Sequence, residues 1–409
     1  MRSDGSEQSP APSIIALSEP EIGGREWEYV KDCLDSGWVS SVGAYVERFE
    51  QAVASYVGAR QGVATSSGTA ALHVALQVAG IQPNDEVLVS TLTFIAPANA
   101  IRYVGAWPVF LDADPRYWQL DVEKLESFLK TQCDTHEGRP RNKATGRTVR
   151  AIVPVHILGH PCDIASICDV ARRYGLYVIE DATESLGACY DGKPIGSWGD
   201  AACFSFNGNK LLTTGGGGMV VTDREDWAKR AKYLTTQAKD DPVEYIHHDV
   251  GYNYRLTNVQ AAIGCAQLER IHEFLEKKRR IAARYAEAFE KLTELQCPNE
   301  APRAKSAWWL YTVMIDPHVA GVDRRRVLAL CQQRGVQTRP LWQPLHRSPA
   351  HRHSQAYRCE VADRLYERAL SLPSSVGLQA SDQVRVIDAF REALSDGSGG
   401  AQSRPHSVM

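Results

Sequence analysis

The 409-residue sequence lacks any stretch of the roughly 18 uncharged apolar residues that a membrane-spanning helix requires. Its first thirteen residues mix charge with Ser and Pro, and they contain no apolar segment of the kind found in secretory signals. The ten cysteines are scattered, with no CxxC pair and no Cys/His spacing typical of a metal site. We therefore expect a cytoplasmic protein with reduced thiols, no metal and no membrane association.

The sequence also lacks a strong charge bias, because its net charge is only -3. Nucleic acid is therefore not an expected partner. Neither a GxGxxG fingerprint nor a Walker sequence is present, which disfavours dinucleotide-binding and P-loop proteins. The length exceeds the roughly 250–300 residues at which single cores stop growing, so we expect two domains.

Short apolar runs alternate with helical patterns along the first two thirds of the chain. This alternation predicts an α/β fold with a mostly parallel central sheet that helices cover on both faces. The predicted strands are 62–65, 86–90, 108–111, 151–155, 176–180, 201–206 and 218–222. Crossover helices are predicted at 69–79, 164–174 and 226–234.

A long helical pattern at 258–295 can bridge two domains. We predict a large domain at 14–270 and a smaller α+β domain at 271–395, flanked by disordered tails at 1–13 and 396–409. Smaller elements complete the prediction: a surface loop at 134–149, a strand at 308–315, and helices at 322–334 and 361–370.

Two residues with complementary chemistry follow predicted strands. Asp181 comes directly after the buried strand 176–180, at the sheet edge where open α/β folds place ligands. Lys210 lies in a glycine-containing turn after strand 201–206, where desolvation can prepare an amine for Schiff-base formation. Pyridoxal phosphate (PLP) would explain both, since its ring nitrogen needs an acid and its aldehyde needs an amine. A helix-capping aspartate and a solvent-facing lysine are the alternative.

Three further features fit such a cofactor. The sequence Ser66-Ser67-Gly68-Thr69 lies between a strand and a helix, where backbone N–H groups and the helix dipole favour a phosphate, although it could be only a helix cap. The glycine run 215–218 permits close backbone approach, or serves as a flexible connector. Phe94 follows strand 86–90 and could stack on a pyridine ring, or pack in the core.

Longer motifs make the chain resemble the DegT/DnrJ/EryC1/StrS family of sugar aminotransferases, which are fold type I PLP enzymes. The resemblance covers nearly all of residues 14–390. It rests on LSEPEIGGREW (17–27), SGWVSSVG (36–43), TSSGTAAL (65–72), TLTFIAPANAI (91–101), PVHILGHP (154–161), IEDATESLG (179–187), CFSFNGNKLLTTGGGGM (203–219), DDPVEYIHHDVGYNYRLTNVQAAIG (240–264) and QTRPLWQPLH (337–346).

The resemblance implies roles for individual residues. Lys210 would hold PLP as a Schiff base, Asp181 would face the pyridine nitrogen, and Glu184 would lie near the ring hydroxyl. The phosphate would contact Gly68, Thr69 and Ser205. Asn253 would reach the phosphate of a neighbouring subunit, which implies an obligate homodimer. We also consider Trp38, Arg339 and His346 as candidates for lining the sugar side, with ordinary packing or a surface ion pair as the alternative for each. The chain departs from many relatives at Glu184, where they have Gln or His, and at Gly216, where they have an acid.

The activity that the resemblance implies is transfer of an amino group from L-glutamate to C4 of UDP-2-acetamido-2,6-dideoxy-4-keto-hexose, as in legionaminic acid and bacillosamine pathways. Relatives that act as dehydratases have His in place of the lysine, so Lys210 favours transamination. Two alternatives remain. The substrate could be GDP-4-keto-6-deoxymannose, as in perosamine synthesis, or the protein could be a PLP-binding regulator without turnover.

Overall fold

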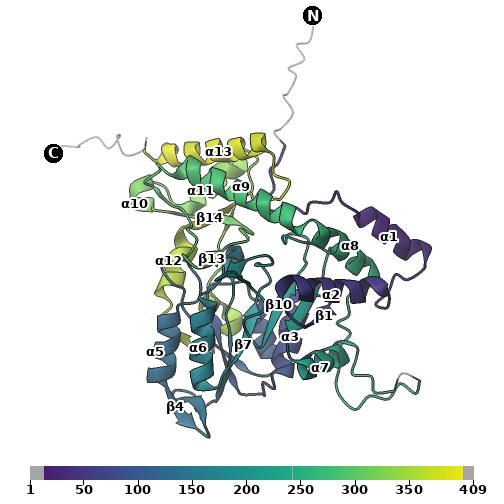
Figure 1. Ribbon diagram of the computed structural model, residues 1–409. Helices are drawn as coiled ribbons and strands as arrows, with labels where there is room; N and C mark the ends of the chain where they lie inside the picture. The colour runs from purple at the N-terminus through teal and green to yellow at the C-terminus, as the bar shows by residue number, and fades with distance from the viewer. Residues whose placement is uncertain (1–12, 242, 399–409) are drawn as a thin grey trace, which may run out of the picture.

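The structure, a computed structural model, describes residues 13–241 and 243–398. Its centre is an eight-stranded sheet with the strand order β1-β11-β10-β7-β6-β2-β3-β16 (Figure 1). The strands are β1 (Gln61–Thr65), β2 (Glu86–Ser90), β3 (Trp107–Leu111), β6 (Val149–Val153), β7 (Tyr177–Asp181), β10 (Ala201–Ser205), β11 (Gly218–Thr222) and β16 (Ala356–Tyr357). Every strand predicted for this sheet is found, with ends that differ by at most two residues.

The direction of the strands decides where the site lies. From β10 to β16 each pair of neighbours is parallel. Strand β11 is antiparallel to both of its neighbours, so β1 runs in the same direction as β10. The predicted mostly parallel sheet is thus confirmed. The carboxyl ends of β1, β7 and β10 share one edge, where open α/β sheets bind ligands.

Helices cover both faces because strand side chains alternate between two buried clusters. In β3, Val109 and Leu111 belong to one cluster and Phe110 to the other. The first cluster includes residues of α2 (Ala44–Val57), α5 (Val122–Gln132), α6 (Ile164–Tyr174) and α8 (Asn258–Glu269). The second includes residues of α3 (Gly68–Val78), α4 (Ala96–Tyr103) and α7 (Glu225–Thr235). A sheet sandwiched by helices is the result (Figure 1).

The C-terminal part is a smaller α+β unit around a sheet with the order β12-β14-β17-β15. Its elements are α9 (Ile271–Phe289), β12 (Leu295–Gln296), β14 (Tyr311–Ile315), α10 (Pro317–Ala320), α11 (Arg324–Gln333), β15 (Arg339–Pro340), α12 (Glu360–Arg368), β17 (Ala369–Leu372) and α13 (Ala380–Ser398). Its own apolar cluster joins Ile15 to residues of α9, α11 and α13. The predicted long helix is two helices that meet at Arg270, and the domain boundary placed there stays a prediction.

The remaining elements belong to neither of these two sheets. They are α1 (Glu26–Asp35), β4 (Cys133–His136), β5 (Arg139–Asn142), β8 (Cys189–Tyr190), β9 (Lys193–Pro194), β13 (Ala304–Lys305) and the 3-10 turns η1 (Ile157–Gly159), η2 (Leu345–Arg347) and η3 (Pro349–His351). In the part of the chain that the structure describes, no helix is long and apolar enough to cross a membrane.

The structure differs from the local predictions at four places. The predicted loop 134–149 contains the β4–β5 hairpin, because buried Asn142 donates to Glu86 Oε2 at 2.7 Å and fastens the segment to β2. The predicted strand 308–315 begins only at Tyr311, since Trp308 has a φ of 51°. The predicted helix 361–370 ends at Arg368, after which β17 pairs with β14. Helix α13 continues to Ser398, into the predicted tail; residues 1–12 and 399–409 lie outside the described residues.

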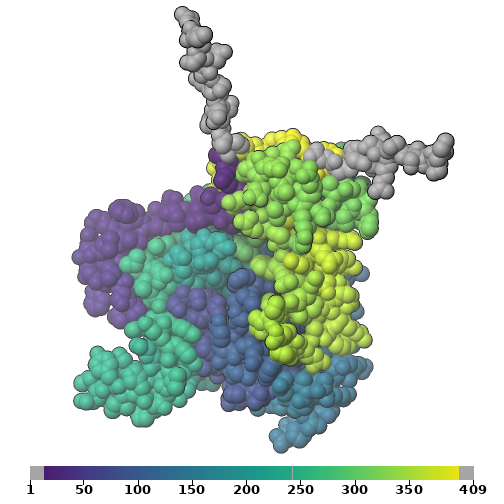
Figure 2. Space-filling view, turned by 180° about the vertical axis from the view of Figure 1, so that it is seen from behind, coloured from purple at the N-terminus to yellow at the C-terminus, as the bar shows by residue number. Residues whose placement is uncertain are grey.

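A segment after α7 projects from the body of the molecule (Figures 1 and 2). Apolar side chains on this arm, which we define as residues 237–241 and 243–252, are exposed: Val243 by 78%, Tyr245 by 66% and Val250 by 81%. The arm ends next to Asn253.

Candidate active site

A cavity of about 450 Å³ opens at the carboxyl edge of the central sheet. Asp181 ends β7, Ser205 ends β10, and Ser66 follows β1, so three strand ends deliver polar residues to one place. The cavity is lined by Ser66, Ser67, Gly68, Thr69, Thr93, Phe94, Ala96, Pro97, Asp181, Thr183, Glu184, Ser205, Asn207, Asn209, Lys210, Gly216, Gly217, Trp309 and Trp342.

Asp181 is the buried acid of this cavity, with 2% of its surface exposed. Backbone hydrogen bonds fix it, since its N–H donates to the Pro154 carbonyl at 2.9 Å and its own carbonyl accepts from His156 N–H. The Thr183 N–H donates to Asp181 Oδ1 at 3.2 Å. Burial raises the pKa of the Asp181 carboxyl above its ordinary value. A cation in the cavity would return the Asp181 carboxyl to its ionised form.

Behind the strand that carries Asp181, a buried network holds the sheet edge rigid. The Cys162 N–H donates to His156 Nδ1 at 2.9 Å, so this nitrogen carries a lone pair and the proton lies on Nε2. His156 Nε2 then donates to Glu180 Oε2 at 3.2 Å. Glu180 also accepts backbone N–H groups from Gly196, Trp198 and Gly199. A fully satisfied network of this kind fixes the position of the neighbouring acid.

Lys210 enters the cavity from the turn after β10, which its N–H closes on the Asn207 carbonyl at 3.0 Å. Its side chain is 14% exposed, and Nζ lies 3.5 Å from Glu184 Oε1. Glu184 is held at its other oxygen, Oε2, by the Leu158 N–H at 2.8 Å. Burial raises the pKa of the Glu184 carboxyl. The Lys210 amine and the Glu184 carboxyl thus lie next to each other at one wall of the cavity.

The start of α3 forms the end of the cavity that is suited to bind an anion. Ser67 caps this helix by accepting from the Ala70 N–H at 3.1 Å, and Gly68 and Thr69 begin its first turn. A Cβ added to Gly68 would lie 2.9 Å from Ser205 Cβ, so only glycine fits between this turn and β10. N–H groups, hydroxyls and a helix dipole that converge in this way favour a phosphate. We call residues Ser67, Gly68, Thr69 and Ser205 the phosphate cradle.

These residues fit PLP. The cavity offers an acid for the ring nitrogen, an amine for the aldehyde and a cradle for the phosphate. Phe94 also lines the cavity, and 56% of its surface is exposed. The planar ring of PLP would cover this exposed phenyl ring by stacking on it.

The structure brings together most of the predicted site residues. Those that line the cavity are Ser67, Gly68, Thr69, Phe94, Asp181, Glu184, Ser205 and Lys210. Among residues 13–241 and 243–398, four predicted residues are not part of the cavity lining. Asn253 is exposed and bridges Thr236, and Trp38 is 57% exposed. Arg339 lies exposed on β15, and His346 Nδ1 pairs with Thr91 Oγ1 at 2.8 Å. Their roles stay predictions.

Trp309 and Trp342 were missed by sequence reasoning, although both line the cavity. Their rings are almost parallel, with centroids 6.4 Å apart. Both come from the C-terminal part of the chain, far in sequence from the strands that carry the acid and the amine. The tryptophan pair Trp308–Trp309 was the only signal, and an apolar pair beside a predicted strand is normally assigned to the core.

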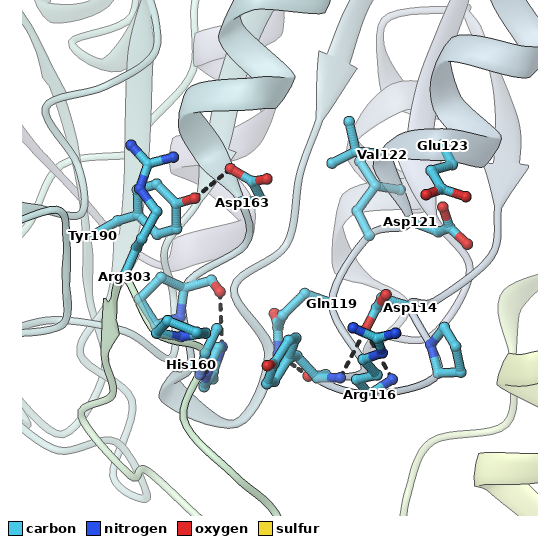
Figure 3. A pocket seen from close by; sticks show the side chains of 16 residues that line it. Asp114, Arg116, Gln119, Asp121, Val122, Glu123, His160, Asp163, Tyr190 and Arg303 are labelled. Atoms are coloured by element: carbon cyan, nitrogen blue, oxygen red, sulfur yellow. Dashed lines mark hydrogen bonds between the residues drawn. The ribbon is translucent and has the colours of Figure 1, made fainter.

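A second cavity, of about 570 Å³, is lined by residues that include Asp114, Gln119, His160, Asp163 and Tyr190 (Figure 3). Two of its polar side chains are engaged in local hydrogen bonds. Asp163 caps α6 and accepts from the Tyr190 hydroxyl at 2.5 Å. His160 uses both ring nitrogens, with the Pro161 carbonyl at 2.8 Å and the Ala301 N–H at 3.0 Å. Burial lowers the pKa of His160 to about 4. Among the described residues the lining contains no lysine, so it offers no counterpart of the Lys210 amine.

Comparisons with known proteins agree with the geometry. The model of the DegT/DnrJ/EryC1/StrS aminotransferase family matches residues 20–391. A GDP-perosamine synthase of Caulobacter vibrioides is 41% identical over 93% of this chain and 98% of that protein. One from Escherichia coli O157:H7 is 37% identical over 93% and 99%. The crystal structure of the aminotransferase TlmJ from Streptoalloteichus hindustanus matches with a TM-score of 0.85 at 29% identity, covering 94% of this chain and 100% of that chain. The chain belongs to the DegT/DnrJ/EryC1/StrS family and is a PLP-dependent sugar aminotransferase.

Proposed function

We propose that this aminotransferase converts GDP-4-keto-6-deoxymannose into GDP-perosamine, with L-glutamate as the amino donor. The observation that carries the proposal is the 41% identity to a GDP-perosamine synthase across 98% of that protein's length. The second relative of the same name supports it. Motif resemblance had favoured a UDP-linked 4-keto-acetamido sugar, so this nucleotide sugar is the competing substrate.

The residues of the cavity divide the work. When bound, PLP supplies an aromatic ring that withdraws electrons and stabilises negative charge on the adjacent carbon. Asp181 would hold the proton on the ring nitrogen, because a carboxylate buried beside a cation favours the charged pair. Lys210 would hold the cofactor and, as a free amine, would accept and return the proton at C4 of the sugar. The phosphate cradle would fix the position of the cofactor relative to Lys210.

We also propose that the active enzyme is a homodimer with shared sites. Asn253, the predicted contact to a neighbouring phosphate, is exposed in this chain and follows the projecting arm. The arm carries Val243, Tyr245 and Val250, which are exposed apolar side chains suited to burial against a second copy. Tyr252 and Tyr254 on either side of Asn253 stack on each other at 4.9 Å. Gln77 of α3 donates to the Tyr252 hydroxyl at 2.7 Å and holds this strand in place.

The test of the substrate is a paired assay with purified protein, PLP and glutamate. GDP-4-keto-6-deoxymannose and UDP-2-acetamido-2,6-dideoxy-4-keto-hexose are offered separately, and the amino sugar is identified by mass spectrometry. We expect kcat/KM at least tenfold higher with the GDP substrate. A preference for the UDP substrate would overturn the proposal and would instead support the UDP-linked sugar that the motifs indicate.

The same assay separates an enzyme from a regulator. Glutamate alone should convert the bound cofactor to its amine form, which changes the visible absorbance spectrum. Lys210→Ala is the matched control, because it removes the amine and leaves the acid and the cradle. Absence of any glutamate-dependent change in the unmodified protein would support a PLP-binding protein without turnover.

A further inference from the structure

The amine of Lys210 rests against an aromatic face. Its Nζ lies 4.0 Å from the centroid of the Trp309 ring and 3.5 Å from Glu184 Oε1. A tryptophan face attracts a cation more strongly than any other aromatic side chain. The ring is 4% exposed, so the contact is shielded from water, which strengthens it. The amine therefore has a defined position between an indole face and a carboxylate.

Trp309 is held in this position by three other elements. Its Nε1–H donates to the carbonyl of Asn209, the residue before the lysine, at 2.7 Å. Its own carbonyl accepts from the buried amine of Lys278, on α9, at 2.8 Å. A Cβ on Gly159 would lie 2.7 Å from Trp309 N, so the backbone passes this glycine at contact distance. These contacts fix the indole face next to the turn that carries Lys210.

The reaction gives this arrangement a use. In the first half-reaction the nitrogen of the amino donor would take the place of the lysine nitrogen on the cofactor, so Lys210 would regain a free amine. In the second half-reaction Lys210 would displace the nitrogen of the product and bond to the cofactor again. That amine must stay beside the reacting carbon, because it then moves a proton and later bonds to the cofactor again. A long flexible side chain loses entropy when it is confined, and an aromatic face and a carboxylate offset that loss.

We propose that Trp309 is a positioning residue of this enzyme, whose indole face, together with Glu184, holds the Lys210 amine whenever that amine is not bonded to the cofactor. The proposal rests on the proposed role of Lys210. Trp342 provides the contrast: it lines the same cavity, and within the described residues its ring contact is to Trp309 and not to the lysine.

The first test needs no turnover. Cofactor-free protein is treated with a reagent that modifies free amines, and the labelling rate of Lys210 is measured by peptide mass spectrometry relative to exposed Lys130. A cation–π contact of about 0.5–2 kcal/mol corresponds to roughly a two- to thirtyfold change. We expect Trp309→Leu to label Lys210 faster by this factor, Trp309→Phe to lie between, and Trp342→Leu to match the unmodified protein.

The second test measures the half-reaction with glutamate in a single turnover. Trp309→Leu should slow it by a similar factor while the affinity for PLP stays unchanged within about twofold. Trp309→Phe keeps an aromatic ring of lower cation affinity, so it gives a result even where the leucine variant does not fold. Equal Lys210 labelling in Trp309→Leu and the unmodified protein, or equally fast labelling in Trp342→Leu, would overturn the proposal. If Lys210→Ala keeps both the visible absorbance band of bound PLP and the activity, the proposed role of Lys210 itself is wrong, and not only that of Trp309.

Discussion

Gly218 gives the sharpest test of the phosphate cradle. It begins β11 and lies against the peptide that joins Ser67 to Gly68 at the start of α3. In Gly218→Ala the new Cβ would lie 2.4 Å from Ser67 O, whereas ordinary contact begins at 3.4 Å, so that peptide must move by about 1.0 Å. The Gly68 N–H belongs to this peptide, and a displacement of this size breaks a hydrogen bond to a phosphate. Loss of one bond to a charged group, about 1.5–3 kcal/mol, weakens binding roughly 10- to 150-fold.

The assay is a titration of cofactor-free protein with PLP, followed by absorbance, together with thermal unfolding. Gly208→Ala is the control, because a Cβ at this neighbouring turn has nothing within 4 Å. We expect the control to bind PLP like the unmodified protein. The reasoning is refuted by unchanged PLP affinity in Gly218→Ala, and also by an equal loss of affinity in Gly208→Ala.

Three further changes test other parts of the account. Asp181→Asn keeps the shape of the side chain but cannot hold a proton on the ring nitrogen, so product formation should fall by roughly 10²-fold or more, and near-normal turnover would contradict this. In Glu180→Gln an amide NH₂ group would face backbone N–H donors, so one buried donor would lose its acceptor. Chemical denaturation should show that the free energy of unfolding falls by about 3 kcal/mol. A loss below about 1 kcal/mol would argue against the buried network. Burial lowers the pKa of Lys278 from 10.5 to about 7, so the unfolded state binds more protons above pH 7 and stability rises with pH. Relative to Lys278→Met, the unmodified protein should gain about 2 kcal/mol between pH 7 and 9, and a constant difference would exclude a depressed pKa.

The acid and the amine of the site could be found from the sequence because each follows a recognisable strand. Asp181 and Lys210 sit at strand ends whose apolar runs are continuous, and parallel strand ends meet at one edge. The Ser-Gly-Thr start of α3 was equally local. At these positions the chemistry of the residue and the predicted secondary structure of its neighbours both indicated the same location at the sheet edge.

The second wall of the site could not be found in this way. Trp309 reaches Lys210 only because the C-terminal part folds back over the sheet edge, and no local pattern reports that approach. The hairpin within 134–149 was not predicted for a related reason. It is anchored by hydrogen bonds from Asn142 and Thr145 to buried Glu86, and a pattern of hydrophobic residues does not report buried polar partners. The roles of Trp38, Arg339, His346 and Asn253 stay predictions.

The central claim is that one lysine carries the cofactor at this sheet edge. The most direct measurement is reduction of the PLP-loaded protein with borohydride, which makes the bond between cofactor and lysine permanent, followed by digestion and mass spectrometry. The account predicts the reduced cofactor on the peptide that contains Lys210. Recovery of the cofactor on a different lysine, or of unmodified Lys210 from protein that had shown the visible band, would contradict it.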